Sequence, residues 1–314
     1  MTRVALAGLE VHPLCLGGNV FGWTSDEATS FAVLDAYVAA GGNFIDTADS
    51  YSVWIPGLSG GESETIIGRW LQRRARRDDL VIATKVGRLP DFPGLSRKSI
   101  IGGLEASLRR LHTDYVDVYF THVDDETVPL TETLRALDEL VRAGKVRYLG
   151  ASNYSATRLE QALAVARAER LAPFVAYQHE YNLVERAGYE AKHQAVCAAE
   201  GVAFMPYYSL ANGFLTGKYR SGQVPESARS AKASRYLDQR GAAVLAVLDE
   251  LAAAHRTNVA AVALAWLARQ PTVTTPVASA RTPAQLAALL EFTDLRLADD
   301  EVAQLDTITA PLPS

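Results

Sequence analysis

The sequence predicts an α/β protein: a (β/α)8 TIM barrel with an N-terminal β-hairpin and extra C-terminal helices. Short apolar runs of strand length alternate with stretches of helical periodicity eight times along the chain. No segment between them is long enough to be a linker, and 314 residues is a common length for one such barrel. We therefore expect residues 1–314 to form a single domain.

The strands are predicted from runs of apolar residues that end in polar ones. Apolar residues first alternate over 4–14 around a turn at 7–10, which is typical of a hairpin. The barrel strands are then expected at 14–18, 43–48, 80–85, 115–120, 145–150, 174–178, 202–206 and 273–276.

The helices are predicted from apolar residues three and four positions apart, such as Ile66, Ile67, Trp70 and Leu71. Glycines at 41–42, 144 and 201 are expected to stop three of them. The predicted helices lie around 31–38 and at 62–74, 97–111, 131–143, 156–170, 189–200, 241–255, 259–269, 282–291 and 299–308. Only 208–240 is a long connection, and a loop of that length in a compact domain is usually functional or mobile.

The composition is that of an ordinary globular enzyme, with 48% hydrophobic residues, 21% charged residues and a net charge of −5. No basic stretch favours nucleic acid, no apolar run has membrane-spanning length, and the N-terminus does not resemble a secretion signal. No Cys/His spacing indicates a metal site. The two cysteines, Cys15 and Cys197, are far apart, so we expect free thiols and a cytoplasmic protein; the oligomeric state is not indicated.

Polar side chains follow the predicted strands at their carboxyl ends, where barrels of this type carry their chemistry. Asp46 lies at the end of the second strand and Tyr51 follows it, Lys85 ends the third, and His122 comes just after the fourth. Singly, each has an ordinary interpretation: a loop cap, a packing aromatic, a rim lysine or a hydrogen-bonded histidine. Their occurrence on three consecutive strand ends favours a shared catalytic role.

These four residue types make a coherent acid catalyst. A tyrosine normally titrates near ~10, and a neighbouring ammonium lowers that pKa. Lys85 could supply this charge, while Asp46 would pair with Lys85 and hold it in place. His122 could donate a hydrogen bond to an oxygen on which negative charge develops. The set would protonate an alkoxide-like oxygen without a metal.

Several motifs together resemble the aldo-keto reductase superfamily. They are Asp46-x4-Tyr51 within Phe44–Tyr51, Gly61-Glu62-Ser63-Glu64, Thr84-Lys85, Thr121-His122, Gly150–Asn153 and Leu210–Tyr219. The resemblance covers nearly the whole chain, and the short tail after 308 is similar to that of bacterial-type members. It implies an NADP-dependent oxidoreductase that passes hydride from NADPH to the carbonyl of an aldehyde or ketone, with Tyr51 as the proton donor.

The resemblance also implies where the cofactor binds, although the chain has no G-x-G-x-x-G motif. Ser152, Asn153 and Gln178 would bind the carboxamide, and Tyr207 would stack on the nicotinamide. The pyrophosphate would lie against Ser209, Leu210, Gly213 and Lys218. Ser279, Arg281 and Gln285 would hold the adenosine end, where Arg281 suits a 2′-phosphate and so favours NADPH over NADH.

The chain departs from the family pattern away from the four catalytic positions. Val123 stands where an arginine often follows the histidine, Ser209 replaces a common proline, Ser279 a glycine, and Leu289 an adenine-contacting asparagine. Trp23 and Trp54 fall in loops after the first two strands and are expected to line the substrate pocket.

Two other functions stay open. Some relatives of this barrel serve ion channels, so a cofactor-binding regulatory subunit with slow turnover is one alternative. A non-redox isomerase that uses Tyr51 and His122 as acid and base is the other. Oxidation of NADPH by a panel of carbonyl compounds would distinguish these functions.

Overall fold

Eight parallel strands form the central sheet of the molecule. The computed structural model, which describes residues 3–74, 76–220, 222 and 224–311, orders them β10–β3–β4–β5–β6–β7–β8–β9. The two ends of this order are also joined, because Thr274 N donates to Phe204 O at 2.8 Å and Val277 N to Pro206 O at 2.9 Å. The sheet thus curls round on itself, and the predicted (β/α)8 fold is confirmed.

The strands are short and follow one another around the barrel in chain order. They are β1 (Val4–Leu6), β2 (Leu9–Val11), β3 (Cys15–Gly17), β4 (Phe44–Asp46), β5 (Val81–Val86), β6 (Val116–Thr121), β7 (Val146–Ser152), β8 (Phe174–Gln178), β9 (Ala203–Phe204) and β10 (Val277–Ala278).

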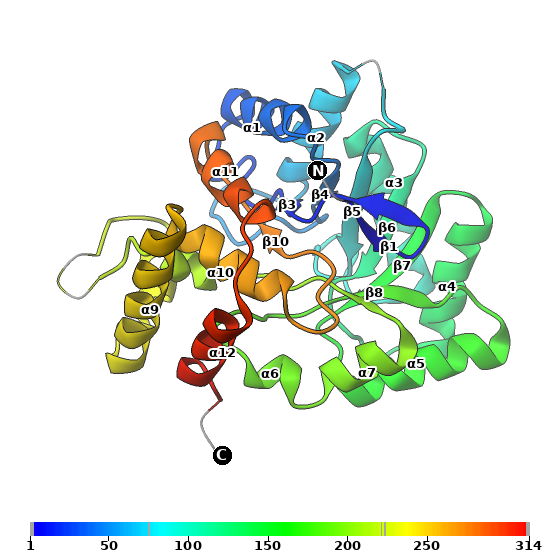
Figure 1. Ribbon diagram of the computed structural model, residues 1–314. Helices are drawn as coiled ribbons and strands as arrows, with labels where there is room; N and C mark the ends of the chain where they lie inside the picture. Colours follow the sequence, from blue (N-terminus) through cyan, green and yellow to red (C-terminus); the bar gives the residue numbers. More distant parts are fainter. Residues whose placement is uncertain (1–2, 75, 221, 223, 312–314) are drawn as a thin grey trace.

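The helices surround the sheet (Figure 1). Side-chain caps begin several of them; Ser96, for example, accepts from Ser99 N and Ser155 from Arg158 N. The α-helices are α1 (Glu27–Ala39), α2 (Glu62–Gln72), α3 (Arg97–Leu111), α4 (Leu130–Arg142), α5 (Ala156–Glu169), α6 (Ala187–Glu190), α7 (His193–Glu200), α8 (Ser230–Ser234), α9 (Gln239–His255), α10 (Val259–Ala268), α11 (Pro283–Leu290) and α12 (Asp299–Ile308). The 3-10 helices are η1 (Ala211–Thr216) and η2 (Glu291–Thr293).

The predicted N-terminal hairpin is present and closes one mouth of the barrel. β1 and β2 pair antiparallel, and Leu6, Leu9 and Val11 are buried in one cluster with Phe44 and Met205 from the barrel interior. Since Phe44 begins β4, the hairpin covers the amino ends of the strands. The hairpin does not cover the opposite mouth, at the carboxyl ends of the strands, where barrels of this type carry their active sites.

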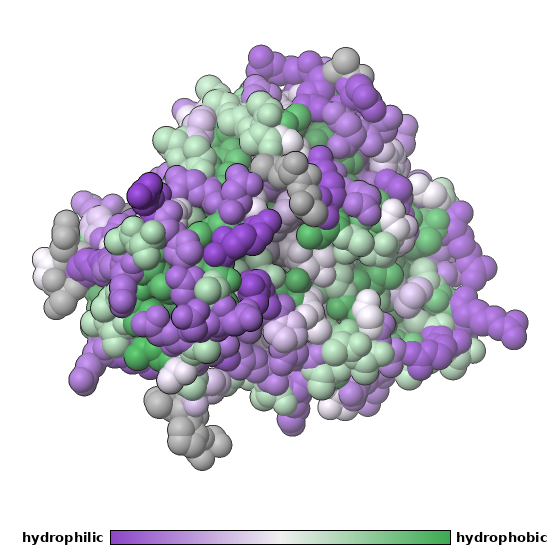
Figure 2. All heavy atoms as spheres, in the orientation of Figure 1, coloured by the Kyte–Doolittle hydropathy of each residue, from purple (hydrophilic) through white to green (hydrophobic). Residues whose placement is uncertain are grey.

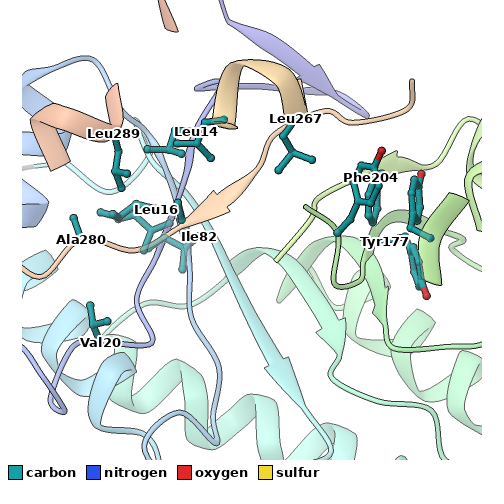
Figure 3. Close-up of a cluster of buried hydrophobic side chains, with 14 of the residues drawn as sticks. Leu14, Leu16, Val20, Ile82, Tyr177, Phe204, Leu267, Ala280 and Leu289 are labelled. Carbon is teal, nitrogen blue, oxygen red and sulfur yellow. The ribbon is translucent and has the colours of Figure 1, made fainter. Parts of the chain in front are cut away.

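A second hydrophobic layer lies between the sheet and the helices. In Figure 3, Leu16 and Ile82 from the sheet and Leu14 just before β3 lie near Ala280 and Leu289. Elsewhere in the cluster the rings of Tyr177 and Phe204 lie side by side. On the face shown in Figure 2, hydrophobic residues occur in small groups between hydrophilic ones. The buried layers hold the strand ends in fixed relative positions.

The eighth barrel strand lies later than predicted. We expected it at 273–276, whereas β10 is Val277–Ala278. Residues before it do run beside β9, since Val273 forms an isolated bridge with Phe204. Pro276 has no N–H to donate. After the hydrogen bond from Thr274 N to Phe204 O, the next hydrogen bond toward β9 and the residues after it is therefore donated by Val277 N, three residues later. The ladder is therefore interrupted where the sequence suggested a continuous strand.

Two further differences concern helices. The helix predicted at 189–200 is broken into α6 and α7 at Lys192, whose φ of −146° is not helical. The His193 ring contacts Gly188 O at 3.0 Å and so ties the two pieces together. The long connection at 208–240 is not structureless either, because it contains η1 and α8.

The two cysteines are free and buried, as expected. Within the described ranges, no helix has the length and apolar character needed to cross a membrane. In the same ranges, no group of three or more His, Cys, Asp or Glu side chains is arranged to hold a metal ion.

Candidate active site

The four predicted catalytic residues meet at the carboxyl ends of neighbouring strands. Asp46 is the last residue of β4, Lys85 lies near the end of β5, and His122 directly follows β6. The parallel register puts Asp46 beside Ala83 and Lys85 beside Phe120, which brings these ends to one level. Tyr51 returns to the same place from the loop after β4.

Asp46, Lys85 and Tyr51 form a closed triangle of polar contacts. Lys85 Nζ lies 2.6 Å from Asp46 Oδ2 and 2.8 Å from the Tyr51 phenol oxygen. The phenol in turn donates to Asp46 Oδ2 at 3.0 Å. The ammonium also donates to Thr47 O at 2.8 Å, and Lys85 is only 2% exposed. A buried charge needs such partners, and this arrangement satisfies the ammonium in full.

The pKa of Tyr51 is higher than the sequence suggested. We expected Lys85 to lower its pKa, but burial and the negative charge of Asp46 raise the pKa of Tyr51 well above its ordinary value. The reason is that Asp46 offsets the charge of Lys85 and also accepts the phenol hydrogen, which stabilises the protonated form. Tyr51 is therefore held in its protonated form.

His122 is held by its backbone and by one polar contact of its ring. Its N–H donates to Val86 O at 2.8 Å, its carbonyl accepts from Asn153 Nδ2 at 3.0 Å, and Ser50 Oγ lies 3.2 Å from Nδ1. Burial, Lys85 and Arg88 lower the pKa of His122 well below its ordinary value. The ring is therefore neutral near pH 7, and it meets the Tyr51 ring edge-on at 6.1 Å.

The residues predicted to bind a carboxamide lie beside this triangle. Ser152 and Gln178 end the adjacent strands β7 and β8 and are paired in register. Gln178 Nε2 donates to the second oxygen of Asp46 at 2.8 Å, a contact that the sequence did not reveal. Asn153, at a φ of 59°, donates to Ser152 Oγ and accepts from the Tyr207 phenol at 2.7 Å. These four polar side chains are thus brought together.

The residues predicted to cover a pyrophosphate are placed on and around η1. The Ser209 hydroxyl donates to Pro206 O and Val277 O, so any anion would meet this residue through its backbone. Gly213 has a φ of 97°, and a Cβ there would lie 3.6 Å from Lys218 Cε. The half-buried Leu210 precedes η1, and Lys218 Nζ lies 5.1 Å above the Tyr219 ring.

The three residues predicted at the adenosine end form a separate group after β10. Ser279 Oγ donates to Asn19 Oδ1 at 2.6 Å, and the Gln285 side chain accepts from Arg281 N at 3.0 Å. The carbonyl of Arg281 also accepts from Ser25 Oγ. Among the described residues, no ion pair is made by Arg281 or Lys218, so both cations are available to an anionic ligand.

The two predicted pocket tryptophans meet above Tyr51. Trp23 and Trp54 pack edge-on at 5.9 Å, and Trp54 lies 6.3 Å from the Tyr51 ring. Trp54 is 51% exposed, which is unusual for so large an apolar side chain. Arg229, from the long connection, lies over Trp23 at 5.7 Å. The sequence alone could not place Arg229, because the path of that connection is set by tertiary contacts.

Two surface hollows lie at the other mouth of the barrel. One of about 330 Å³ is lined in part by Ala7, Phe174 and Gly201, and one of about 470 Å³ by His112 and Lys145. Phe174 begins β8, and Lys145 precedes β7. Both hollows are therefore at the amino ends of the strands, away from the Asp46–Lys85–Tyr51 triangle.

Comparison with known proteins agrees with the fold. The model of the aldo/keto reductase family matches residues 13–310, almost the whole chain. The chain belongs to the aldo/keto reductase family. This family resemblance was expected from the motifs at the strand ends and is confirmed.

Relatives of this aldo/keto reductase have diverse names. Protein Tas of Escherichia coli (strain K12) is 36% identical over 99% of both chains. An aryl-alcohol dehydrogenase of Pestalotiopsis microspora is 34% identical over 96% of this chain and 79% of its own. A probable voltage-gated potassium channel subunit beta of Oryza sativa subsp. japonica is 34% identical over 92% and 89%. The family, and the relatives that are named as oxidoreductases, indicate that this chain is an oxidoreductase.

Proposed function

We propose that the protein is an NADPH-dependent carbonyl reductase that converts an aldehyde or ketone into an alcohol. The observation that carries this proposal is the triangle of Asp46, Lys85 and Tyr51, in which a protonated phenol lies 2.8 Å from a buried ammonium. Such a phenol can donate its proton, because the neighbouring ammonium stabilises the phenolate that remains.

The side chains supply a complete path for the proton. When bound, a reduced nicotinamide supplies hydride to the carbonyl carbon. As negative charge grows on the carbonyl oxygen, that oxygen becomes more basic than a phenolate and takes the Tyr51 hydrogen. Lys85 then stabilises the phenolate, and Asp46 holds Lys85 in place. His122 donates a hydrogen bond to the same oxygen.

The donor set fits a phosphate-bearing nicotinamide cofactor. Lys218 is suited to the pyrophosphate, and Arg281 to a 2′-phosphate through its planar guanidinium. Ser152, Asn153 and Gln178 offer hydroxyl and amide groups to a carboxamide, and Tyr207 offers a ring face. This distribution of cations favours NADPH over NADH. The free thiols fit a cytoplasmic protein.

The substrate is proposed to be an aromatic carbonyl compound. The Trp54 ring lies 5.9 Å from the Trp23 ring and 6.3 Å from the Tyr51 ring, so the three rings form a continuous aromatic surface. Aromatic rings pack well edge-on or offset against such surfaces. A relative bears the name aryl-alcohol dehydrogenase, which fits the same class.

The test is a turnover assay with NADPH and NADH over aromatic aldehydes, dicarbonyls and keto sugars. We expect oxidation of NADPH, fastest with an aromatic aldehyde, and slower use of NADH. Failure of the protein to bind either cofactor would contradict the redox function. A preference for keto sugars would contradict the aromatic substrate class alone.

A second candidate is a cofactor-binding subunit with slow turnover. Its support is the 34% identity to the probable channel subunit beta. This function predicts tight NADPH binding without appreciable turnover of any carbonyl in the same assay. The reductase function predicts both binding and turnover.

A further inference from the structure

Ser50 and His122 approach each other from two different strand ends. Ser50 follows β4, is 2% exposed, and places Oγ 3.2 Å from Nδ1 of His122. Among the described residues, the other contacts of His122 are backbone hydrogen bonds and edge-on packing with the Tyr51 ring. The Ser50 hydroxyl is therefore the polar group that lies at a nitrogen of the His122 ring.

The position of the ring hydrogen decides whether His122 can act as a donor. The ring is neutral near pH 7, and a neutral imidazole carries one hydrogen, on either Nδ1 or Nε2. Only the form with hydrogen on Nε2 can receive a hydrogen bond at Nδ1 and still donate one from the other nitrogen. A carbonyl oxygen needs that donor.

The surroundings of Ser50 indicate which atom donates. A buried hydroxyl requires an acceptor for its hydrogen. Ser50 also faces the carboxyl of Asp49, but that carboxyl makes no hydrogen bond of normal geometry among the described residues, and its pKa of about 8 keeps it protonated near pH 7. His122 Nδ1 is the acceptor that the geometry offers to Ser50 Oγ.

We propose that Ser50 is a positioning residue that donates to His122 Nδ1 and thereby keeps the ring hydrogen on Nε2, directed to the substrate oxygen. The proposal rests on the proposed carbonyl reduction and deepens it. Ser50 does not touch the reacting atoms in this scheme. It acts only through the tautomer and orientation of His122.

The direct test measures the tautomer. With six histidines in the chain, the ring nitrogens can be followed by ¹H–¹⁵N spectra of ¹⁵N-labelled full-length protein, with a His122→Gln spectrum to assign the signal. We expect hydrogen on Nε2 alone in the wild type and a mixture of both tautomers in Ser50→Ala. Hydrogen on Nδ1 in the wild type, or an unchanged spectrum in Ser50→Ala, would overturn the proposal.

Kinetics provide the second readout. Loss of one neutral hydrogen bond corresponds to about a fivefold fall in kcat for Ser50→Ala, with NADPH affinity unchanged. Ser50→Thr keeps the hydroxyl and should restore most of the rate and the wild-type tautomer. Equal rates in Ser50→Ala and the wild type would contradict the proposal.

A matched control separates this effect from simple loss of a buried hydroxyl. Ser52 lies two residues away, is fully buried, and its Oγ has no hydrogen-bond partner among the described residues. Ser52→Ala should leave the tautomer and kcat unchanged. If the wild type reduces no carbonyl but Ser50→Ala still shifts the tautomer, the proposed function fails while the control of the ring by Ser50 stands.

Discussion

At the scale of single residues, the site depends on charges that are buried in matched groups. Asp46 accepts from Lys85, Tyr51 and Gln178, so each of its oxygens is used. Removal of Lys85 would leave the Asp46 carboxylate buried without a counter-charge, which costs far more than the pair itself contributes. The proposed catalytic positions are for this reason also sensitive points of stability.

Asp49 is a buried carboxyl that lies next to this group but is not part of it. Both its oxygens lack a hydrogen-bond partner among the described residues, and burial and Glu64 raise its pKa to about 8. Arg110, Tyr119 and Ser50 are the other charged or polar groups that face it. Arg110 pairs with Glu64 at 2.6 Å, and its charge offsets the raised pKa of Asp49 only in part.

The raised pKa of Asp49 predicts how stability varies with pH. In the unfolded chain this carboxyl ionises near its ordinary 3.8, whereas in the fold it stays protonated up to about 8. The native state thus binds more protons between these values, and stability falls as pH rises through that window. Asp49→Asn removes the ionisation. We expect it to raise the free energy of unfolding by on the order of 5 kcal/mol near pH 9 and to change it little near pH 4.

Urea unfolding of the wild type and Asp49→Asn at several pH values measures this difference. Asp26→Asn is a useful comparison, since that carboxylate is exposed and its pKa is lowered by Thr29. Its effect should have the opposite sign, with a loss of stability at neutral pH. An Asp49→Asn effect independent of pH would show that Asp49 does not titrate as described.

At the scale of elements, short β-strands and close helix contacts place the site. The four strand-end residues could be predicted because each follows an apolar run, and parallel strands bring their carboxyl ends together. The break at Lys192 and the shift of β10 could not, because the first depends on a tertiary contact of His193 and the second on a missing N–H at Pro276. The Ser50–His122 and Gln178–Asp46 contacts depend on side-chain directions, which sequence spacing does not reveal.

The contact between α2 and α3 gives a prediction at this scale. Gly68 in α2 packs so closely on α3 that a Cβ there would overlap the carbonyl oxygen of Arg110. Gly68→Ala is expected to lower the free energy of unfolding by about 1–3 kcal/mol, despite the better helix propensity of alanine. Chemical denaturation measures this change.

Gly188→Ala serves as the control for Gly68→Ala. Gly188 is also helical, in α6, and an added Cβ would meet only His179 Cε1, at an ordinary 3.5 Å. This variant should be neutral or slightly stabilising. Equal destabilisation by both substitutions would argue against the close approach of α2 and α3.

Over the whole molecule, the two mouths of the barrel differ in the side chains that line them. The hairpin closes the amino ends with apolar side chains, while the carboxyl ends carry the charged triangle, the tryptophans and the long connection. The barrel was predictable from eight alternating units. The position of Arg229 over Trp23 was not, because the polar residues of 208–240 have no period that predicts their path.

Cofactor binding is expected to stabilise the entire barrel. A ligand that binds only the native state at 100 times its Kd adds about 2.7 kcal/mol. We expect NADPH to raise the midpoint of thermal unfolding, and NADH to do so less at the same concentration. Arg281→Ala should remove most of the difference between the two cofactors. A preference that survives in Arg281→Ala would assign the discrimination to other residues.

The central claim is that Tyr51 donates the proton, and the most direct test is the phenylalanine substitution. Tyr51→Phe removes only the hydroxyl that lies 2.8 Å from Lys85 Nζ. We expect kcat for carbonyl reduction to fall by roughly 10²–10⁴ while the Kd for NADPH, from fluorescence titration, stays close to the wild-type value. A Tyr51→Phe protein that keeps most of its reductase activity would show that another group donates the proton.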